Sequence, residues 1–558
     1  MAWGAIVVGS GMGGLTTAAY LTTNGIPTLV LERYDTVGGY SQVFRRKRKF
    51  EFDVGVHYVG DCAPGGGVPT VLRGLGLDDR VEFRQLDPDG FTTILFPGLE
   101  FRVPAGWENY RERLIETFPD EERRLRLCLW VLERMGREVD REGARRVTRF
   151  PLRAPVGGTL GMLPLTRWFD ICGLSERARA VICGEWGDYA APPSRTPLVA
   201  HAYFMYQYIK SGGFYPKGGG QVLPANLLDV IQSHGGAVRT QAHVERILVE
   251  GGRAVGVKLA TGETLYAPVI VSNADVKRTY LELVGREHLR KRTVRRVERY
   301  RMAFPLTPVY LGLDIDIADH MRATQYWAHK TTDIEGRYRH LSEGTVDPDF
   351  PLYVTSTTLK DPDNPQIAPP GYSTVLLMAV MPSQHAFWRV GDGPAAGEKY
   401  SRNPEYRAVK DQFADALIDR ADELIPGLKE HIVWREAGTP VTNERYTLCS
   451  DGACYGLEAT LDQFGPLRPG AKSKIAGLYL TGASTLWGPG IANTMFGGVG
   501  TASAILGRDL LSEIRAGRVF ADPARLPTHG PDWDPLMACR RLAHKPRSHK
   551  RDREAATA

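Results

Sequence analysis

The first residues whose spacing suggests chemistry are glycines that follow a short apolar run. Residues 5–8 (Ala-Ile-Val-Val) predict a buried parallel strand, and Gly9, Gly11 and Gly14 follow in the pattern G-x-G-x-x-G. The first glycine permits a tight turn, the second lets the backbone approach a pyrophosphate, and the third lets helix and strand pack closely. The helix predicted over residues 15–24 would direct free N–H groups and a positive dipole end at the phosphates.

A carboxylate ends the second predicted strand. Glu32 follows residues 28–31 and lies 23 positions after Gly9, where an acid can accept hydrogen bonds from a ribose. A carboxylate there favours a free ribose hydroxyl over a 2′-phosphate. Strand, glycines, helix, strand and acid within about 30 residues predict a dinucleotide-binding unit. A glycine-rich turn without a nucleotide is the disfavoured alternative.

Two cysteines have a spacing that suggests redox chemistry. Cys449 and Cys454 show the C-x(4)-C pattern of flavin-linked disulfide reductases. In those enzymes the pair closely follows the first nucleotide turn, and a second glycine fingerprint binds a pyridine nucleotide. Here the pair comes more than 400 residues later, and no second fingerprint follows a strand. We therefore interpret residues 445–456 as a loop that lines the active site, with a redox disulfide as the weaker alternative.

The distribution of charge limits the classes of partner. Seven basic and two acidic residues at positions 540–558 account for five of the six net positive charges, so the rest of the chain is close to neutral. This balance predicts no nucleic-acid binding. The basic tail is expected to be a solubilising end. Attraction to anionic lipid, worth about 1 kcal/mol per charge near a membrane surface, is the weaker interpretation.

Several features favour a cytoplasmic location. The first 32 residues lack the basic side chains of a signal peptide, and no segment approaches the run of apolar residues that spans a bilayer. Seven scattered cysteines fit reduced thiols. We expect a cytoplasmic protein, with peripheral contact to a membrane surface as an open alternative. No metal site is predicted, and the sequence does not indicate the oligomeric state.

Longer motifs resemble one superfamily of flavoproteins. Residues 33–39 place Gly38 and Gly39 as in the E-x(5)-G-G element of the amine oxidase and phytoene desaturase superfamily, where this second turn also touches the pyrophosphate. The superfamily often carries Arg after the glycine pair; Tyr40 stands here, which fits the desaturase branch better than the amine oxidase branch. Residues 50–60 (FEFDVGVHYVG) resemble the F-D-x-G-x-H-Y-x-G stretch of the phytoene desaturase, carotenoid isomerase and retinol saturase group.

The resemblance extends along most of the chain and implies FAD as the cofactor. Residues 213–220 (GFYPKGGG) match the group's aromatic-P-x-G-G turn, and residues 477–483 (GLYLTGA) match its closing strand. In this family Val244 would lie against the adenine. The predicted cofactor-binding residues are Gly9, Ser10, Gly11, Met12, Gly13, Gly14, Glu32, Arg33, Gly38, Gly39, Tyr40, Ser41, Val56, His57, Tyr58, Val244, Asn273, Gly482, Ala483, Gly490, Ile491 and Asn493.

The implied fold is α/β, with a Rossmann-like FAD-binding domain of the glutathione reductase type and an α+β substrate-binding domain. Three strand-like segments, residues 307–313, 352–356 and 374–380, predict a sheet floor for the substrate domain, under a long apolar pocket. The FAD-binding domain is discontinuous, over residues 1–62, 212–300 and 445–515; the substrate-binding domain covers 63–211 and 301–444; and 516–558 form a C-terminal extension with a basic tail, poorly ordered up to residue 546.

Two segments of the substrate domain have distinctive composition. Residues 108–140 are highly charged with apolar residues at helical spacing, which predicts a solvated helix pair broken at Pro119. Residues 155–174 are apolar and carry Trp168 and Phe169. They suit either an interfacial segment through which substrate enters or a buried irregular stretch.

Three residues are predicted to act in catalysis: His57, Glu185 and Tyr455. The resemblance places His57 beside the isoalloxazine, where an imidazole could move a proton or only orient backbone and flavin oxygens. Glu185 and its neighbour Asp188 are candidate acids, and carboxylates satisfied at a helix end are the alternative. Tyr455 is predicted to lie near the flavin in the active-site loop.

The implied reaction is hydride exchange between flavin N5 and a carbon of a long apolar substrate of the polyene or isoprenoid type. The motifs are most similar to those of the retinol saturase and carotenoid isomerase branch. This branch predicts saturation or cis–trans isomerisation over phytoene-type desaturation. An amine oxidase-like flavoenzyme and a catalytically silent flavin-binding scaffold are further alternatives.

Overall fold

A five-stranded parallel sheet collects its strands from three distant parts of the chain. The computed structural model, which describes residues 3–142 and 153–543, orders this sheet β19-β13-β1-β2-β9. All four residues of the central strand β1 are buried, as expected for a parallel strand covered on both faces. The strands are β1 (Ala5–Val8), β2 (Thr28–Leu31), β9 (Ala237–Arg239), β13 (Val269–Ser272) and β19 (Leu478–Leu480).

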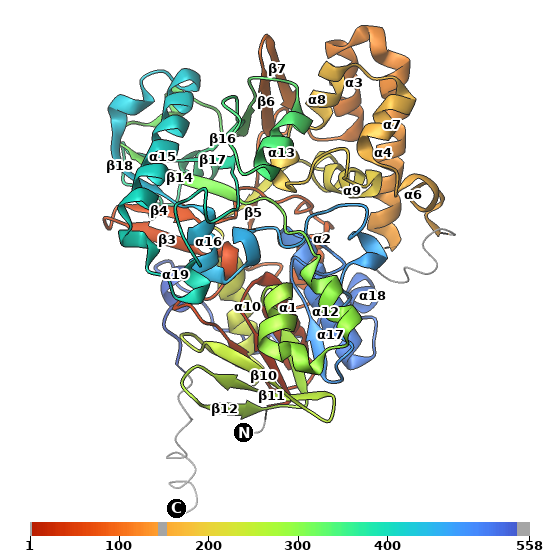
Figure 1. Cartoon of the computed structure of the whole chain (residues 1–558), viewed down its shortest axis with the longest axis vertical. Helices are drawn as coiled ribbons and strands as arrows, with labels where there is room; N and C mark the ends of the chain where they lie inside the picture. The colour runs from red at the N-terminus through yellow and green to blue at the C-terminus, as the bar shows by residue number, and fades with distance from the viewer. Residues whose placement is uncertain (1–2, 143–152, 544–558) are drawn as a thin grey trace, which may run out of the picture.

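Alternate residues of β1 pack into two different layers. Ala5 and Val7 contact the cluster formed with the helices, while Ile6 and Val8 contact a three-stranded antiparallel sheet. Figure 1 shows this small sheet at the lower end of the molecule. The helices are α1 (Met12–Thr23), α10 (Val222–Ser233) and α17 (Ile491–Leu506), and the small sheet is β10 (Val244–Glu250), β11 (Arg253–Leu259) and β12 (Thr264–Tyr266).

A seven-stranded sheet, mostly antiparallel, lies in the upper half of the view (Figure 1) and runs in the order β18-β14-β17-β16-β15-β6-β7. The three strands predicted from the sequence are present as β14, β16 and β17. The strands are β6 (Thr92–Phe96), β7 (Leu99–Val103), β14 (Leu306–Leu313), β15 (Gln325–Ala328), β16 (Leu352–Thr355), β17 (Ser373–Val380) and β18 (Ile432–Ala437).

The two faces of this sheet have different partners. Val309 and Leu311 of β14 belong to a core cluster with α15 (Pro404–Leu424). Leu306 and Tyr310, on the opposite face, belong to the core cluster formed with the helices of residues 107–209, called the helical group below. The hairpin of β3 (Val43–Arg46) and β4 (Phe50–Asp53) packs its aromatic side chains against this second face.

The charged segment predicted as a solvated helix pair forms two helices, but both also supply core residues, Tyr110 and Leu114 in the first. The first, α3, ends before Pro119 as predicted, and α4 begins at Glu122. Leu125, Leu129 and Leu132 of α4 are fully buried, because their spacing places them on one face of the helix, against α9. The helices of this group are α3 (Trp107–Thr117), α4 (Glu122–Glu142), α6 (Pro155–Leu160), α7 (Leu165–Cys172), α8 (Glu176–Ile182) and α9 (Leu198–Ile209).

The apolar segment 155–174 is helical, not irregular. Trp168 and Phe169 of α7 are buried in the core of the helical group, and Ile171 of the same helix is exposed. Figure 1 shows these helices grouped on the side opposite α15. Across residues 3–142 and 153–543, no helix has both the length and the apolar character required to span a bilayer.

The C-terminal extension was predicted to be poorly ordered up to residue 546, and this prediction is wrong for residues 516–543. The backbone N–H of Val37 donates to the carbonyl of Cys539 (2.9 Å), and that of Thr240 donates to the carbonyl of Leu542 (3.0 Å). Cys539 is completely buried among the helices of the parallel sheet. The composition of the segment did not reveal this docking, because its partners lie at the other end of the chain. The tail beyond residue 543 lies outside the described residues.

Short elements complete the connections. β5 (Phe83–Gln85) pairs with β8 (Phe214–Pro216). The remaining helices used below are α2 (Gly67–Arg73), α11 (Val276–Arg278), α14 (Thr357–Lys360), α16 (Pro440–Thr447), α18 (Leu510–Arg515) and α19 (Pro535–Ala538).

Asp534 is expected to hold the C-terminal segment in place. Its carboxylate accepts hydrogen bonds from the N–H groups of Leu536 and Met537 at the start of α19 and forms a bidentate ion pair with Arg45. An Asp534→Ala substitution removes both interactions, so local opening, measured as labelling of Cys539 by a thiol reagent, should increase roughly tenfold.

Asp522→Ala is the matched control for this prediction. Asp522 also caps a helical turn that begins with proline, but no ion pair involves it in the part of the chain that the structure describes. Mass spectrometry of the Cys539 peptide gives the labelling rate. Equal labelling in the two variants would contradict the role assigned to Asp534.

Candidate active site

A cavity of about 890 Å³ opens at the carboxyl ends of the parallel strands. The turns that follow β1, β2, β13 and β19 line it, and it continues to the seven-stranded sheet, where Tyr310 and Met378 line it. Ligands bind at this edge of α/β sheets because strand ends and helix N-termini converge there. The cavity therefore joins a dinucleotide-type turn to an apolar surface.

The backbone turns in this cavity approach each other too closely for side chains. A Cβ atom on Gly39 would lie 3.1 Å from the Cα of Gly11, and one on Gly13 would lie 2.9 Å from the backbone N of Gly482. Gly482 also has a φ of +94°, which L-residues with a side chain rarely adopt. At these positions the three turns therefore lie backbone against backbone.

Two helix N-termini open into the cavity without a capping side chain. Gly11 is the N-cap of α1 and Gly490 the N-cap of α17, and neither helix has an acidic residue in its first turn. Their free N–H groups and positive dipole ends suit an anion or a polarised ring edge. The hydroxyl of Thr481, which also lines the cavity, is buried with no hydrogen-bond partner. These features fit a bound dinucleotide-type flavin.

The acid at the end of β2 is held by the first glycine turn. Glu32 Oε2 accepts hydrogen bonds from the N–H (2.9 Å) and the hydroxyl (2.7 Å) of Ser10, and Oε1 accepts from the N–H of Tyr34 (2.8 Å). Arg33 lines the same region and donates to the carbonyl of Arg445. Burial lowers the pKa of Arg33. The carboxylate is thus fixed at the end of the cavity where the sequence predicts a ribose.

Most of the predicted cofactor-binding residues line this cavity. Gly14 does not, and it packs helix against strand instead: a Cβ atom there would lie 2.5 Å from the carbonyl oxygen of Gly9. Asn493 bonds to Pro489 and Gln207, and Val56 is buried in the core. The residues from the predicted set that do not line the cavity are Gly14, Val56, Tyr58 and Asn493.

A buried network lies behind the His57 stretch. Lys360, at the end of α14, donates from Nζ to the carbonyl of His57 (2.6 Å). Asp53 accepts from the hydroxyl of Tyr215 and from the N–H of Gly220 (2.9 Å). Burial lowers the pKa of Lys360 to about 8, and the charge of Asp53 opposes this shift. Lys360 was not predicted as a site residue, because no motif surrounds it in the segment TSTTLKD.

Two of the predicted catalytic residues, His57 and Tyr455, line the cavity together. Burial, with a smaller contribution from the charge of Lys360, lowers the pKa of His57 to about 3, so its imidazole is neutral near pH 7. Burial raises the pKa of Tyr455, which keeps its phenol protonated. Neither side chain carries a charge into the cavity at neutral pH.

The third, Glu185, lies in a partly buried acid pair outside the cavity lining. The hydroxyl of Tyr58 is 2.5 Å from Asp188 Oδ2 and 3.3 Å from Glu185 Oε1. Burial raises the pKa of Glu185 to about 7 and raises that of Asp188 well above its usual value. Tyr58 directly follows His57, which lines the cavity. Tyr58 itself faces the acids and does not line the cavity.

The turn that carries the acids is positioned by the seven-stranded sheet. The ring of Trp327 fills the space beside Gly187, where a Cβ atom would lie 2.1 Å from it. The Nε2 atom of His329 lies 2.9 Å from the carbonyl oxygen of Gly184. Trp327 lies in β15 and His329 directly follows it. This strand of the seven-stranded sheet therefore positions the turn that carries the two acids.

The two candidate redox cysteines are free thiols. Cys449 and Cys454 both line the cavity, and the Sγ atom of Cys449 lies 3.7 Å from the hydroxyl of Tyr40. Burial raises the pKa of Cys449 to about 12 and that of Cys454 to about 11. Protonated thiols are poor nucleophiles, which disfavours disulfide exchange at this pair.

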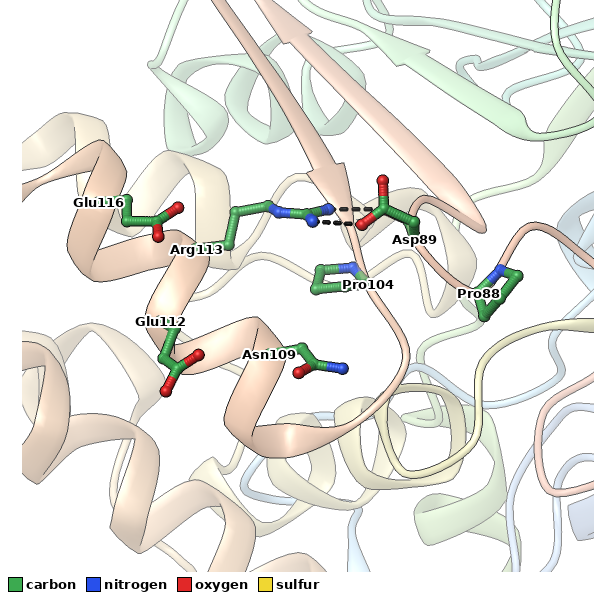
Figure 2. A pocket seen from close by; sticks show the side chains of 7 residues that line it. All are labelled: Pro88, Asp89, Pro104, Asn109, Glu112, Arg113 and Glu116. Atoms are coloured by element: carbon green, nitrogen blue, oxygen red, sulfur yellow. Dashed lines mark hydrogen bonds and ion pairs between the residues drawn. The ribbon is translucent and has the colours of Figure 1, made fainter.

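A second, smaller cavity of about 390 Å³ lies beside α3 (Figure 2). Figure 2 shows Arg113 directed at Asp89, and an ion pair joins them. Glu112 and Glu116 line it on the same helix. Neither a glycine turn nor an aromatic side chain lines it, so it offers no site for a flavin or a polyene.

Comparisons with known proteins agree with this geometry. Residues 12–388 match the family model described as flavin containing amine oxidoreductase. The all-trans-retinol 13,14-reductase of Homo sapiens is 28% identical over 91% of this chain and 86% of its own length. The lycopene-forming phytoene desaturase of Pseudescherichia vulneris is 26% identical over 90% of this chain and 98% of its own.

Among solved structures, an oxidoreductase from Methanosarcina mazei matches 90% of this chain and 100% of its own, with a TM-score of 0.61 and 16% identity. This likeness concerns the fold. It confirms the predicted α/β class, as does the five-stranded parallel sheet. The family match confirms the predicted resemblance and shows that the protein is a flavin-dependent oxidoreductase. The chain belongs to the flavin containing amine oxidoreductase family.

Proposed function

We propose that this protein is an FAD-dependent oxidoreductase that acts on carbon–carbon double bonds of a long apolar polyene or isoprenoid-type substrate. The observation that carries the proposal is one cavity that joins the dinucleotide turns to a wall of aromatic and aliphatic side chains. The activities named for the reductase and desaturase relatives support this substrate class. Saturation or cis–trans isomerisation is favoured, and phytoene-type desaturation is the alternative.

FAD is proposed over a smaller flavin because the cavity offers both ends of a dinucleotide site. Glu32 is assigned to the adenosine ribose and Val244 to the adenine face. The glycine turns after β1 and β2, with the N-terminus of α1, are assigned to the pyrophosphate. Ala483 and the N-terminus of α17 at Ile491 are assigned to the flavin end. The other predicted residues that line the cavity, Arg33, Tyr40, Ser41, His57, Asn273 and Gly482, complete the assigned site.

When bound, the flavin would accept or supply a hydride. Saturating a double bond also consumes one proton, which the protein must deliver to the second carbon. His57 is too weak a base to carry that proton near pH 7, with a pKa of about 3. Glu185, with a pKa of about 7, is about half protonated at neutral pH and mostly protonated below it. We assign the proton to its carboxyl group, with Tyr58, which bonds to both acids, as the group between acid and cavity.

A cytoplasmic location, and contact with a membrane surface through the basic tail, stay predictions. The tail's charges beyond residue 543 lie outside the described residues. An apolar substrate gives such contact a physical reason, because polyenes partition into bilayers.

Gly14→Ala is expected to weaken cofactor binding without a direct contact to the ligand. The added Cβ would lie 2.5 Å from the backbone oxygen of Gly9, so the turn after β1 must shift from its position against the other two turns. The affinity of the protein for FAD should fall at least about tenfold. The ratio of bound FAD to protein is the quantity measured. Cofactor released by denaturation identifies FAD by chromatography. Gly470→Ala, at a site with open space around the Cβ, should keep full FAD content.

A substrate panel tests the reaction class. Oxidised and chemically reduced holoenzyme would be incubated anaerobically with polyenes, retinoids, unsaturated fatty acids and soluble amines, and the products separated by chromatography with mass detection. We expect a mass change of two hydrogens, or an unchanged mass with altered retention, on polyenes. Reaction with amines alone would favour the amine oxidase-like alternative, and silence with reducible bound FAD would contradict the polyene proposal.

Glu185→Gln is expected to reduce saturating activity by about 10²–10⁴ at pH 6, the usual contribution of a general acid. In the wild type, activity should fall as pH rises through about 7, because a carboxyl group with this raised pKa loses its proton there. The variant should lose that pH dependence.

Glu51→Gln is the matched control. The pKa of Glu51 is also raised to about 7 by burial, but Glu51 is paired with Arg45 and does not line the cavity. It should keep the wild-type pH profile. A Glu185→Gln variant with wild-type rate and profile would remove Glu185 as the proton donor.

A further inference from the structure

The sheet face that lines the cavity is apolar except at one place. Leu306, Pro308 and Met378 line it along β14 and β17. Further along β14, Tyr310 is the register partner of Glu436 on β18. Direct cross-strand partners project from the same face with about 5 Å between their Cβ atoms. A phenol and a carboxylate therefore lie side by side on an otherwise apolar wall.

The hydroxyl of Tyr310 is left without a hydrogen-bond partner by the described residues. The side chain is 6% exposed, and the rings of Phe44 and Phe52 pack edge-on against it at 4.8 and 5.4 Å between centroids. In residues 3–142 and 153–543 no group forms a hydrogen bond with this hydroxyl, although it lines the cavity. A hydroxyl that lines a cavity and has no protein partner there is available to a ligand.

Two further observations define the chemistry of the place. Burial raises the pKa of Tyr310, so its hydroxyl stays protonated and can both donate and accept. Arg46 Nε and Nη2 donate to the two oxygens of Glu436 (2.6 and 2.8 Å), and the guanidinium lies 4.7 Å above the ring of Phe44. The side chains of Arg46 and Glu436 are 37% and 42% exposed, which places the ion pair at the rim of the cavity.

The charges of this pair cancel, so the place is polar but close to neutral. Tyr310 can donate a hydrogen bond, and Glu436 keeps lone pairs that can accept one. An alcohol satisfies both at once because it accepts and donates. A carboxylate would face the negative charge of Glu436, and a hydrocarbon would leave the Tyr310 hydroxyl unpaired.

We propose that Tyr310, with the Arg46–Glu436 pair beside it, binds a hydroxyl-bearing end of the substrate. The preferred substrate is then a polyene alcohol, held with its polar end at the rim and its apolar length along the wall of Leu306, Pro308 and Met378. This inference rests on the proposed function and adds the group that orients the substrate in the cavity.

The test compares three ligands on the oxidised holoenzyme: all-trans-retinol, its hydrocarbon analogue without the hydroxyl, and all-trans-retinoic acid. Affinities come from anaerobic titrations in detergent, followed by the flavin absorption spectrum. The wild type should bind the alcohol most tightly. Tyr310→Phe should weaken alcohol binding roughly tenfold and leave hydrocarbon binding within about twofold, since only the hydroxyl contact is removed.

Two other variants sharpen the test. Glu436→Gln leaves the charge of Arg46 uncompensated, so it should weaken alcohol binding and strengthen retinoic acid binding. It also carries the test if Tyr310→Phe does not fold. Tyr266→Phe, at a 61% exposed tyrosine on β12, is the matched control and should bind all three ligands as the wild type does.

The outcomes separate this inference from the function on which it rests. Equal loss of alcohol and hydrocarbon binding in Tyr310→Phe, or no loss, overturns it. Loss of bound FAD in that variant would show that the hydroxyl serves the cofactor and also overturns it. A wild-type holoenzyme that binds none of the three ligands contradicts the proposed function, and the inference with it.

Discussion

Three backbone turns meet at the carboxyl end of the parallel sheet, closer than side chains would permit. Their contacts require β1 to pair with β13 and β13 with β19 in one register, so that Val8, Ser272 and Leu480 end side by side. These strands come from the start, the middle and the last fifth of the chain. The cavity between the turns therefore depends on all of them, and a single added Cβ at Gly13 or Gly14 acts on the site through the backbone.

The buried Lys360 extends this dependence to the seven-stranded sheet. Lys360 follows β16 through α14, and its ammonium group bonds to the carbonyl of His57 in the stretch that leads from the second turn. The nearby charge of Asp53 favours the protonated form of Lys360 and opposes the effect of burial. The strands of the seven-stranded sheet are thus linked to the turns of the parallel sheet by this hydrogen bond as well as by packing.

Local motifs explain which parts of the site could be predicted. The glycines at Gly9 to Gly14 and the acid Glu32 lie in one continuous strand–helix–strand unit, whose chemistry depends on near neighbours. Lys360 and the Tyr310–Glu436 pair depend on strand register between distant segments, which residue types alone do not encode. The same reason explains the wrong prediction for residues 516–543: Cys539 is buried by contacts with Val37 and other residues near the start of the chain.

Binding of the polar end of the substrate and the reaction itself are assigned to different parts of the cavity. His57, Tyr455, Cys449 and Cys454 are all uncharged at neutral pH, so the region they line is a low-polarity environment in which a polyene can lie without desolvating a charge. Behind this region, the carboxyl group of Glu185 has a pKa near 7 and can exchange a proton near neutral pH. A polar anchor beside it would compete for that proton, whereas an anchor at the rim, on β14 and β18, orients the substrate without disturbing the neutral interior.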